Sequence, residues 1–211
     1  MRPVVLEAAV AFLLGYAAGS VPLGLLVAYL FAGIDIRRHG TGNVGASNVW
    51  RNVGLLPAAV VALGVFLQGL LPPLAARLLG AQEGVVAAAA LGPVVGYGWS
   101  PFLGFRGGRA LGVATGAAAA LSPGGLLVLL GTYALGALLR QIPPATLLAF
   151  VLYAAYAFLT GAPPAYRAAA ALLLVLVAAR RLEGVRREVR RGPPVRAVLE
   201  LLVFQRRRPG R

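Results

Sequence analysis

The sequence predicts an all-α fold, a polytopic transmembrane protein of about seven helices with its N-terminus outside and its C-terminus in the cytoplasm. Three observations lead there. Of the 211 residues, 59% are hydrophobic and only 12% are charged, whereas soluble domains are about 45–50% apolar and about 25% charged. Apolar stretches near the ~20 residues that cross a bilayer recur along the chain. The arginines cluster between and after these stretches.

Seven apolar stretches predict the helices in order. Several are shorter than a full span, so we expect some helices to be tilted, re-entrant or extended by flanking residues. The stretches cover about Val4–Phe31, Val53–Leu79, Val85–Val95, Ala110–Leu121, Leu126–Leu139, Ala145–Leu159 and Ala168–Ala179. They define a transmembrane domain over residues 1–180 and a basic cytoplasmic tail over residues 181–211.

The distribution of arginines predicts the orientation. The chain has no lysine, and with seven crossings all but three of its 20 basic residues fall on one side; Arg2, Arg77 and Arg167 fall on the other. Positive residues remain in the cytoplasm, so we expect a multi-pass membrane protein with its polar loops inside. The net charge of +14 therefore reflects topology and affinity for anionic headgroups, and no nucleic-acid partner is expected.

Composition also excludes some chemistry. The chain has no cysteine and a single histidine, His39, which excludes cysteine-based and multi-histidine metal sites. Asp35 is the one acid near the polar loops, so a pair of acid and base carboxylates is not expected there. We expect no metal and no cofactor.

Three glycine-rich polar segments interrupt the apolar chain. The first motif, Gly19–Gly24, reads GSVPLG and lies inside the first predicted helix, where small residues can also serve close helix packing. The second motif, Gly40–Arg51, reads GTGNVGASNVWR. The third motif, Gly104–Gly116, reads GFRGGRALGVATG and leads directly into a helix.

The second and third motifs have the composition of a phosphate site. Glycines permit close backbone approach and anion-binding turns, helix N-termini favour anions, and arginine forks match phosphate oxygens. The alternatives are a solvated loop with a helix cap for the second motif and a basic loop turned by glycines for the third. Taken together, the motifs predict a site for two phosphates or one polyanion at the cytoplasmic surface.

The three motifs resemble those of the bacterial acyl-phosphate:glycerol-3-phosphate acyltransferase family, the PlsY family, whose signatures read approximately GSIPxG, GSGNxGATNxxR and FKGGKGVAT. Order, spacing and hydropathy agree over nearly the whole chain. The resemblance implies a seven-helix fold that transfers a fatty acyl group from acyl phosphate to the 1-hydroxyl of glycerol 3-phosphate, without a metal. The product is lysophosphatidic acid, a precursor in phospholipid biosynthesis, and the location implied is the bacterial cell (inner) membrane with the active site facing the cytoplasm.

The resemblance also implies site residues. Arg51 and Arg109 are the expected catalytic residues, acting by charge and position. The expected substrate-binding residues are Ser20, Thr41, Gly42, Asn43, Ser47, Asn48, Arg106, Gly107, Gly108, Arg181 and Glu183. The expected partners are acyl phosphate, glycerol 3-phosphate and a bilayer with anionic headgroups; the enzyme that makes acyl phosphate is a further candidate.

The chain departs from the family pattern at several positions. Tyr97 stands where the family has a histidine, and Gln68 lies in a segment that has lost both of the family's charges. Arginines replace the lysines of the third motif, where Ala110 and Leu111 are inserted. After the last helix, Arg181 and Gly184 replace a histidine and an asparagine.

Two other functions therefore stay open. One is a catalytically weak paralogue that binds acyl phosphate or phospholipid without turnover. The other is a small-anion transporter, which is disfavoured because the polar motifs lie at one face and only Ser20 and Gln68 are candidate polar groups within the span.

Overall fold

The structure is a computed structural model that describes residues 4–189 of the chain, with side chains through Glu183. Every regular element in this part is helical, which confirms the predicted all-α class. Its helices are α1 (Val4–Ser20), α2 (Leu23–Ala32), α3 (Ala46–Asn52), α4 (Leu55–Leu78), α5 (Glu83–Gly98), α6 (Leu111–Leu121), α7 (Pro123–Leu138), α8 (Ile142–Leu159) and α9 (Pro164–Val189). Short 3-10 turns occupy Ile36–Arg38 and Pro101–Leu103.

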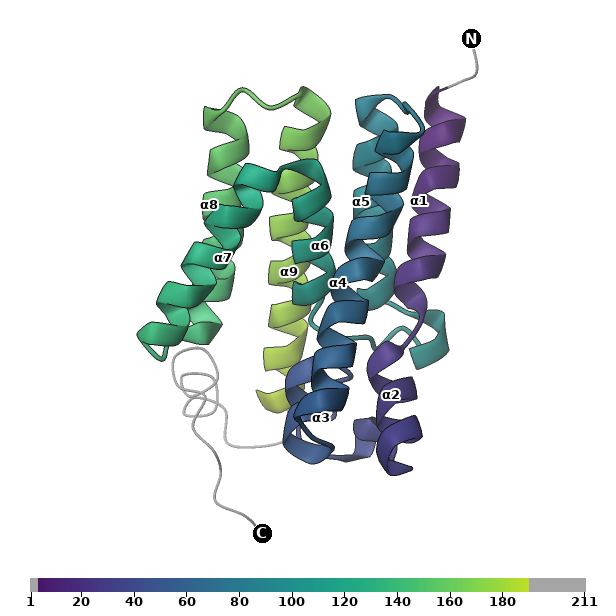
Figure 1. The fold of residues 1–211 in the computed structure, drawn as a ribbon, viewed down its shortest axis with the longest axis vertical. Coiled ribbons are helices and arrows are strands. Elements are labelled where there is room, and N and C mark those ends of the chain that lie inside the picture. Colours follow the sequence, from purple (N-terminus) through teal and green to yellow (C-terminus); the bar gives the residue numbers. More distant parts are fainter. Residues whose placement is uncertain (1–3, 190–211) are drawn as a thin grey trace.

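The long helices run side by side along one axis (Figure 1). The start of α1 and the end of α9 lie at opposite ends of this bundle. The end that carries α2, α3 and the end of α9 is called the α3 end below. The second motif lies wholly at this end, because it leads from the loop after α2 into α3.

Four segments of the described chain are long and apolar enough to cross a membrane, namely Val4–Ala32, Leu55–Leu78, Glu83–Leu103 and Ile142–Leu159. The helices α6 and α7 are apolar but shorter. Each of the seven predicted apolar stretches coincides with helix in the structure. Seven crossings and an outside N-terminus stay predictions.

The predicted division of the chain at residue 180 falls within α9, which continues to Val189. Most of the predicted tail lies outside the described residues. The division into a membrane domain and a basic tail therefore stays a prediction.

The prediction that the first motif lies inside one helix is wrong, because the helix is interrupted at Val21 and Pro22, between α1 and α2. Proline has no N–H, so the carbonyl of Ala18 loses its normal helical donor. Gln68 of α4 replaces that donor: its Nε2 donates to the carbonyl of Ala18 at 2.8 Å and to that of Val21 at 3.0 Å.

Glycines allow α1 and α5 to pack at very short range. A Cβ on Gly19 would lie 2.1 Å from the carbonyl oxygen of Pro93, and one on Gly96 would lie 2.1 Å from that of Tyr16. No real side chain tolerates such distances, so these positions require glycine. The structure thus supports the close-packing interpretation of the first motif.

Candidate active site at the α3 end of the bundle

The end of α5 is the point where the first motif joins the candidate site. The hydroxyl of Ser100 donates to the carbonyl of Ser20 at 2.6 Å, and the hydroxyl of Tyr16 donates to the carbonyl of Trp99 at 2.9 Å. Ser20 is only 1% exposed, and its own hydroxyl donates to the carbonyl of Tyr16 at 2.7 Å. Ser20 therefore connects α1 to the segment after α5; its predicted contact with substrate stays a prediction.

Asn48 organises the second motif. It is 1% exposed, and its Nδ2 donates to the carbonyls of Ile36, His39 and Asn43 at 3.3, 3.0 and 2.9 Å. Its Oδ1 accepts from the backbone N–H of Thr41 at 3.0 Å. One buried amide thus joins four points of the loop, and the structure gives Asn48 a loop-holding role where substrate binding was predicted.

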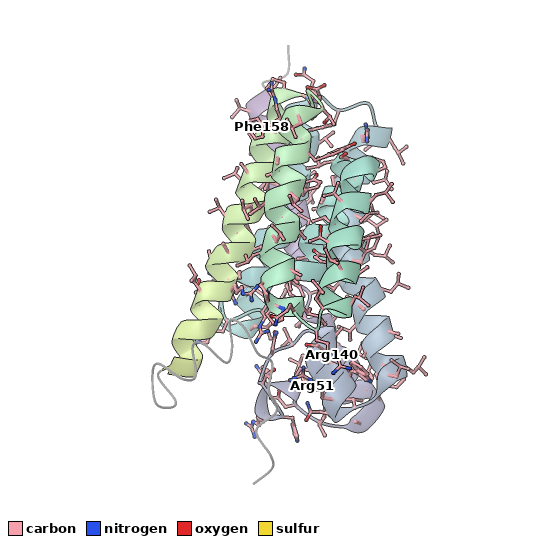
Figure 2. All side chains as sticks on the ribbon, turned by 90° about the vertical axis from the view of Figure 1, so that its left-hand side faces the viewer. Arg51, Arg140 and Phe158 are labelled. Atoms are coloured by element: carbon pink, nitrogen blue, oxygen red, sulfur yellow. The ribbon has the colours of Figure 1, made fainter. Side chains whose placement is uncertain are left out.

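The same motif leaves other predicted residues at the surface. Thr41, Ser47 and Arg51 are exposed, and Asn43 is half-buried. Figure 2 shows Arg51 at the α3 end, with Arg140 at the same end and Phe158 at the opposite one. The second motif therefore offers hydroxyl, amide and guanidinium donors from one short loop.

The acid of this loop is already paired. Asp35 accepts from Arg37 in an ion pair of 2.7 Å, and Arg38 lies 3.9 Å from the same carboxylate oxygen. The hydrogen bond from Arg37 lowers the pKa of Asp35 from 3.8 to about 2. The carboxylate is therefore held by arginine and does not act as a base at neutral pH.

Gly107 and Gly108, the pair at the centre of the third motif, are held against α5. Their backbone N–H groups donate to the carbonyls of Gly98 and Tyr97, at 3.1 and 3.2 Å. These two amides are therefore already bonded within the protein, and the binding of substrate by the two glycines stays a prediction. Both positions need glycine because the turn lies on α5: a Cβ would come within 2.0 Å of the Tyr97 carbonyl oxygen at Gly107, and within 2.3 Å of the Tyr97 ring at Gly108.

Arg106 and Arg109 flank this glycine pair, and both are exposed. The turn holds them at the surface while its backbone is fixed against α5. They remain the predicted phosphate ligands of the third motif.

Tyr97 lies between the second and third motifs. Its hydroxyl oxygen is 3.8 Å from the Cβ position of Gly45 and 2.8 Å from that of Gly108. The side chain is only 5% exposed. The residue that replaces the family's histidine therefore fills the space between the two motifs and keeps them adjacent.

Arg180 of α9 reaches the same turn, although the sequence analysis gave it no role in the site. Its Nε donates to the carbonyl of Gly108 at 3.1 Å and its Nη2 to that of Gly107 at 2.7 Å. Its Nη1 forms an ion pair with Glu183, so the predicted substrate-binding residue Glu183 is held by this arginine. The one available signal in the sequence was its position directly before Arg181, in the segment that resembles the family's own.

The side chain of Arg181 contacts α8. Its Nη1 donates to the carbonyl of Pro143 and to the hydroxyl of Thr146, the latter at 3.0 Å. Burial and the positive charge of Arg109 lower the pKa of Arg181. Two like charges close enough to perturb each other favour an anion bound beside them.

No group of three metal-ligating side chains occurs among the described residues. What the second motif, the third motif and α9 bring together at the α3 end is instead a set of arginines. Such an arrangement can bind phosphate groups through bidentate hydrogen bonds and stabilise negative charge that develops nearby.

Fold and side chains together define a class, that of helical membrane proteins that gather arginines at one end of the bundle. The profile of the family described as glycerol-3-phosphate acyltransferase matches residues 9–191. The chain belongs to this family.

Individual relatives agree with that assignment. A glycerol-3-phosphate acyltransferase of Rubrobacter xylanophilus is 49% identical over 111 residues, which cover 53% of this chain and 55% of the relative. One of Thermus thermophilus is 42% identical over 111 residues, with 53% and 55% covered. The chain thus spans about half the length of the curated relatives it matches.

Two crystal structures of PlsY, an integral membrane glycerol 3-phosphate acyltransferase, share the fold. The glycerol 3-phosphate form has a TM-score of 0.77 and 31% identity, covering 85% of this chain and 90% of the other. The lysophosphatidic acid form has a TM-score of 0.76 and 29% identity, covering 92% and 98%.

Proposed function

We propose that this protein transfers a fatty acyl group from acyl phosphate to the 1-hydroxyl of glycerol 3-phosphate, giving lysophosphatidic acid and phosphate. The observation that carries the proposal is the convergence at the end of α5. Tyr97 contacts the second and third motifs there, and Arg180 of α9 binds the third motif's glycine turn. Similar PlsY structures are named for glycerol 3-phosphate and lysophosphatidic acid, the acceptor and the product of this reaction.

The reaction brings two phosphate-bearing molecules together, and the charge of the site suits this. At the α3 end the described arginines outnumber the acids, and the acids Asp35 and Glu183 are each paired with an arginine. The arginines are Arg37, Arg38, Arg51, Arg106, Arg109, Arg140, Arg180 and Arg181. This excess of positive charge offsets the repulsion between two anionic substrates.

In the transfer, the hydroxyl oxygen attacks the acyl carbonyl and the bond from that carbon to the phosphate oxygen breaks. The hydroxyl proton passes to the departing phosphate, so atoms and charge balance without a protein base. We assign Arg51 and Arg109 to the negative charge that develops on the carbonyl and phosphate oxygens. Thr41, Asn43 and Arg106 are the proposed ligands of the phosphate groups.

We also propose how the site lies relative to the membrane and which enzyme supplies its donor. The arginine distribution supports a cytoplasm-facing site, with the acyl chain in the lipid beside the apolar outer surface of the bundle. The basic residues after α9 would face anionic headgroups. The enzyme that makes acyl phosphate is the proposed supplier of the donor.

The test is transfer by the purified protein in lipid vesicles. Phosphate should leave acyl phosphate only when glycerol 3-phosphate is present, and acyl-CoA and acyl-carrier-protein donors should not replace acyl phosphate. Arg51→Ala should lower kcat/KM at least about 100-fold, the typical loss when one charge-stabilising donor is removed. The matched control is Arg167→Ala, since Arg167 lies near Phe158 at the opposite end of the bundle.

The outcomes separate the alternatives. Folded protein that releases no phosphate at saturating substrates excludes the enzyme, and binding of acyl phosphate without release identifies a weak paralogue. Movement of phosphate across the vesicle membrane would instead identify a transporter.

A further inference from the structure

The guanidinium group of Arg180 is one of the most enclosed charges in the described part of the protein. The residue is 2% exposed. Its guanidinium carbon lies 4.9 Å from the ring centre of Trp99, within the range of a cation–π interaction. A buried charge is tolerated where hydrogen bonds and an opposite charge compensate for lost water, and here Glu183 and two backbone carbonyls do so.

These contacts complete a two-sided attachment of the glycine turn. Its N–H groups are bound by carbonyls of α5, and its C=O groups are bound by Arg180 of α9. Because the guanidinium is planar, Nε and Nη2 approach two successive carbonyls in one fixed geometry. Arg180 thereby fixes the orientation of two of the three peptide units between Arg106 and Arg109, those that follow Gly107 and Gly108.

A glycine at the end of α5 leaves room for the side chain of Arg180. Gly98 lies beneath its side chain, and a Cβ there would come within 3.1 Å of Arg180 Cδ. The Gly98 carbonyl is also the acceptor of the Gly107 amide. The same few residues of α5 thus support both the arginine and the turn that it binds.

We propose that Arg180 is a positioning residue for acyl transfer: it fixes the glycine turn so that Arg106 and Arg109 reach the phosphate groups in one arrangement. This inference rests on the proposed function of the site. Arg180 acts through the turn, since its buried guanidinium is occupied by the carbonyls of Gly107 and Gly108 and by Glu183. A misplacement of about 1 Å at a reacting group can cost about 100-fold in rate, so the turn's orientation should control the rate.

The test substitutes Arg180→Lys, which retains the charge but not the planar fork. We expect kcat/KM to fall about 10- to 100-fold, with the far-UV spectrum unchanged. Arg167→Lys is the matched control: it changes a second arginine of α9 that stacks on an aromatic ring, 5.7 Å from the centre of Phe158, and should leave kcat/KM unchanged.

A double-mutant cycle separates positioning from a structural role. If Arg180 acts through Arg109, then Arg180→Lys should cost little once Arg109→Ala is in place. Independent effects that multiply would overturn the proposal, and so would wild-type kcat/KM in Arg180→Lys. If Arg180→Lys fails to fold, Trp99→Leu takes its place, with a loss of several-fold expected and wild-type kcat/KM as the overturning result.

Binding of glycerol 3-phosphate by calorimetry distinguishes failure of this inference from failure of the proposed function. A wild-type protein that binds glycerol 3-phosphate without turnover refutes the acyltransferase proposal only. In that case a weaker Kd in Arg180→Lys supports the positioning role, and an unchanged Kd overturns it. Absence of glycerol 3-phosphate binding in the folded wild type overturns both.

Discussion

Replacing Gly107 by alanine tests whether acyl transfer depends on the position of the glycine turn in the third motif. The new Cβ would lie 2.0 Å from the carbonyl oxygen of Tyr97 and 2.7 Å from that of Gly98, whereas ordinary contact begins at 3.4 Å. Both obstacles are backbone atoms of α5, so the turn itself must move, by about 1.4 Å to restore contact with Tyr97. That movement also breaks the hydrogen bond from the Gly107 amide to Gly98.

The expected loss follows from this displacement. Since about 1 Å of misplacement costs about 100-fold, Gly107→Ala should lower kcat/KM for glycerol 3-phosphate at least about 100-fold. This corresponds to about 2.7 kcal/mol of transition-state stabilisation. Crowding should also lower the free energy of unfolding by about 1–3 kcal/mol, so transfer and unfolding are measured on the same lipid-reconstituted samples.

Gly131→Ala is the control for this substitution. Gly131 lies within α7, and a Cβ there meets nothing within 4 Å. Its kcat/KM should match that of the wild type. The reasoning is refuted if folded Gly107→Ala protein transfers acyl groups at the wild-type rate, or if both alanine variants lose activity equally.

Two further expectations concern the loops that support the site. Gln68→Leu removes the side-chain donors to the carbonyls of Ala18 and Val21. A carbonyl without a donor is costly within an apolar span, where no water replaces the lost bond, so unfolding in mild detergent should need less denaturant, while Gln82→Leu in the loop before α5 should not change it. Asp35 has its pKa lowered from 3.8 to about 2 by Arg37, so its ion pair should stabilise the loop above about pH 4 and lose this contribution as the pH falls from 3.8 towards 2. Fluorescence of Trp50 in a Trp99→Phe background should therefore be constant from pH 5 to 8 and change only below about pH 4, and a change that persists in Asp35→Asn would contradict this assignment.

The sequence predicted the helices well because lipid imposes a simple rule. A helix that crosses a bilayer must be apolar over its length, since no water is present to satisfy polar groups. It did not predict the break at Pro22, because prolines lie within α4 and α5 without ending them. At this break Gln68, 47–50 residues away along the chain, donates to the carbonyls of Ala18 and Val21, and local sequence carries no sign of that contact.

The contacts within the candidate site could not be predicted from the sequence. The sequence singled out the glycines of the third motif, but their amides bind α5, which only the tertiary structure shows. Arg180 and Arg181 are neighbours in a basic run, so composition could not distinguish them. On a helix they point about 100° apart, and α9 directs Arg180 to the glycine turn and Arg181 to α8.

The contact between Arg180 and Gly108 also bears on how the protein is made. The two residues are separated by 72 positions in the chain. At a synthesis rate of about 5–20 residues per second, Arg180 leaves the ribosome about 4–14 s after the turn that it binds. The attachment of the glycine turn is thus completed only after α9 has been made, and a nascent chain stalled before α9 carries all three glycine-rich motifs with the turn bound to α5 alone.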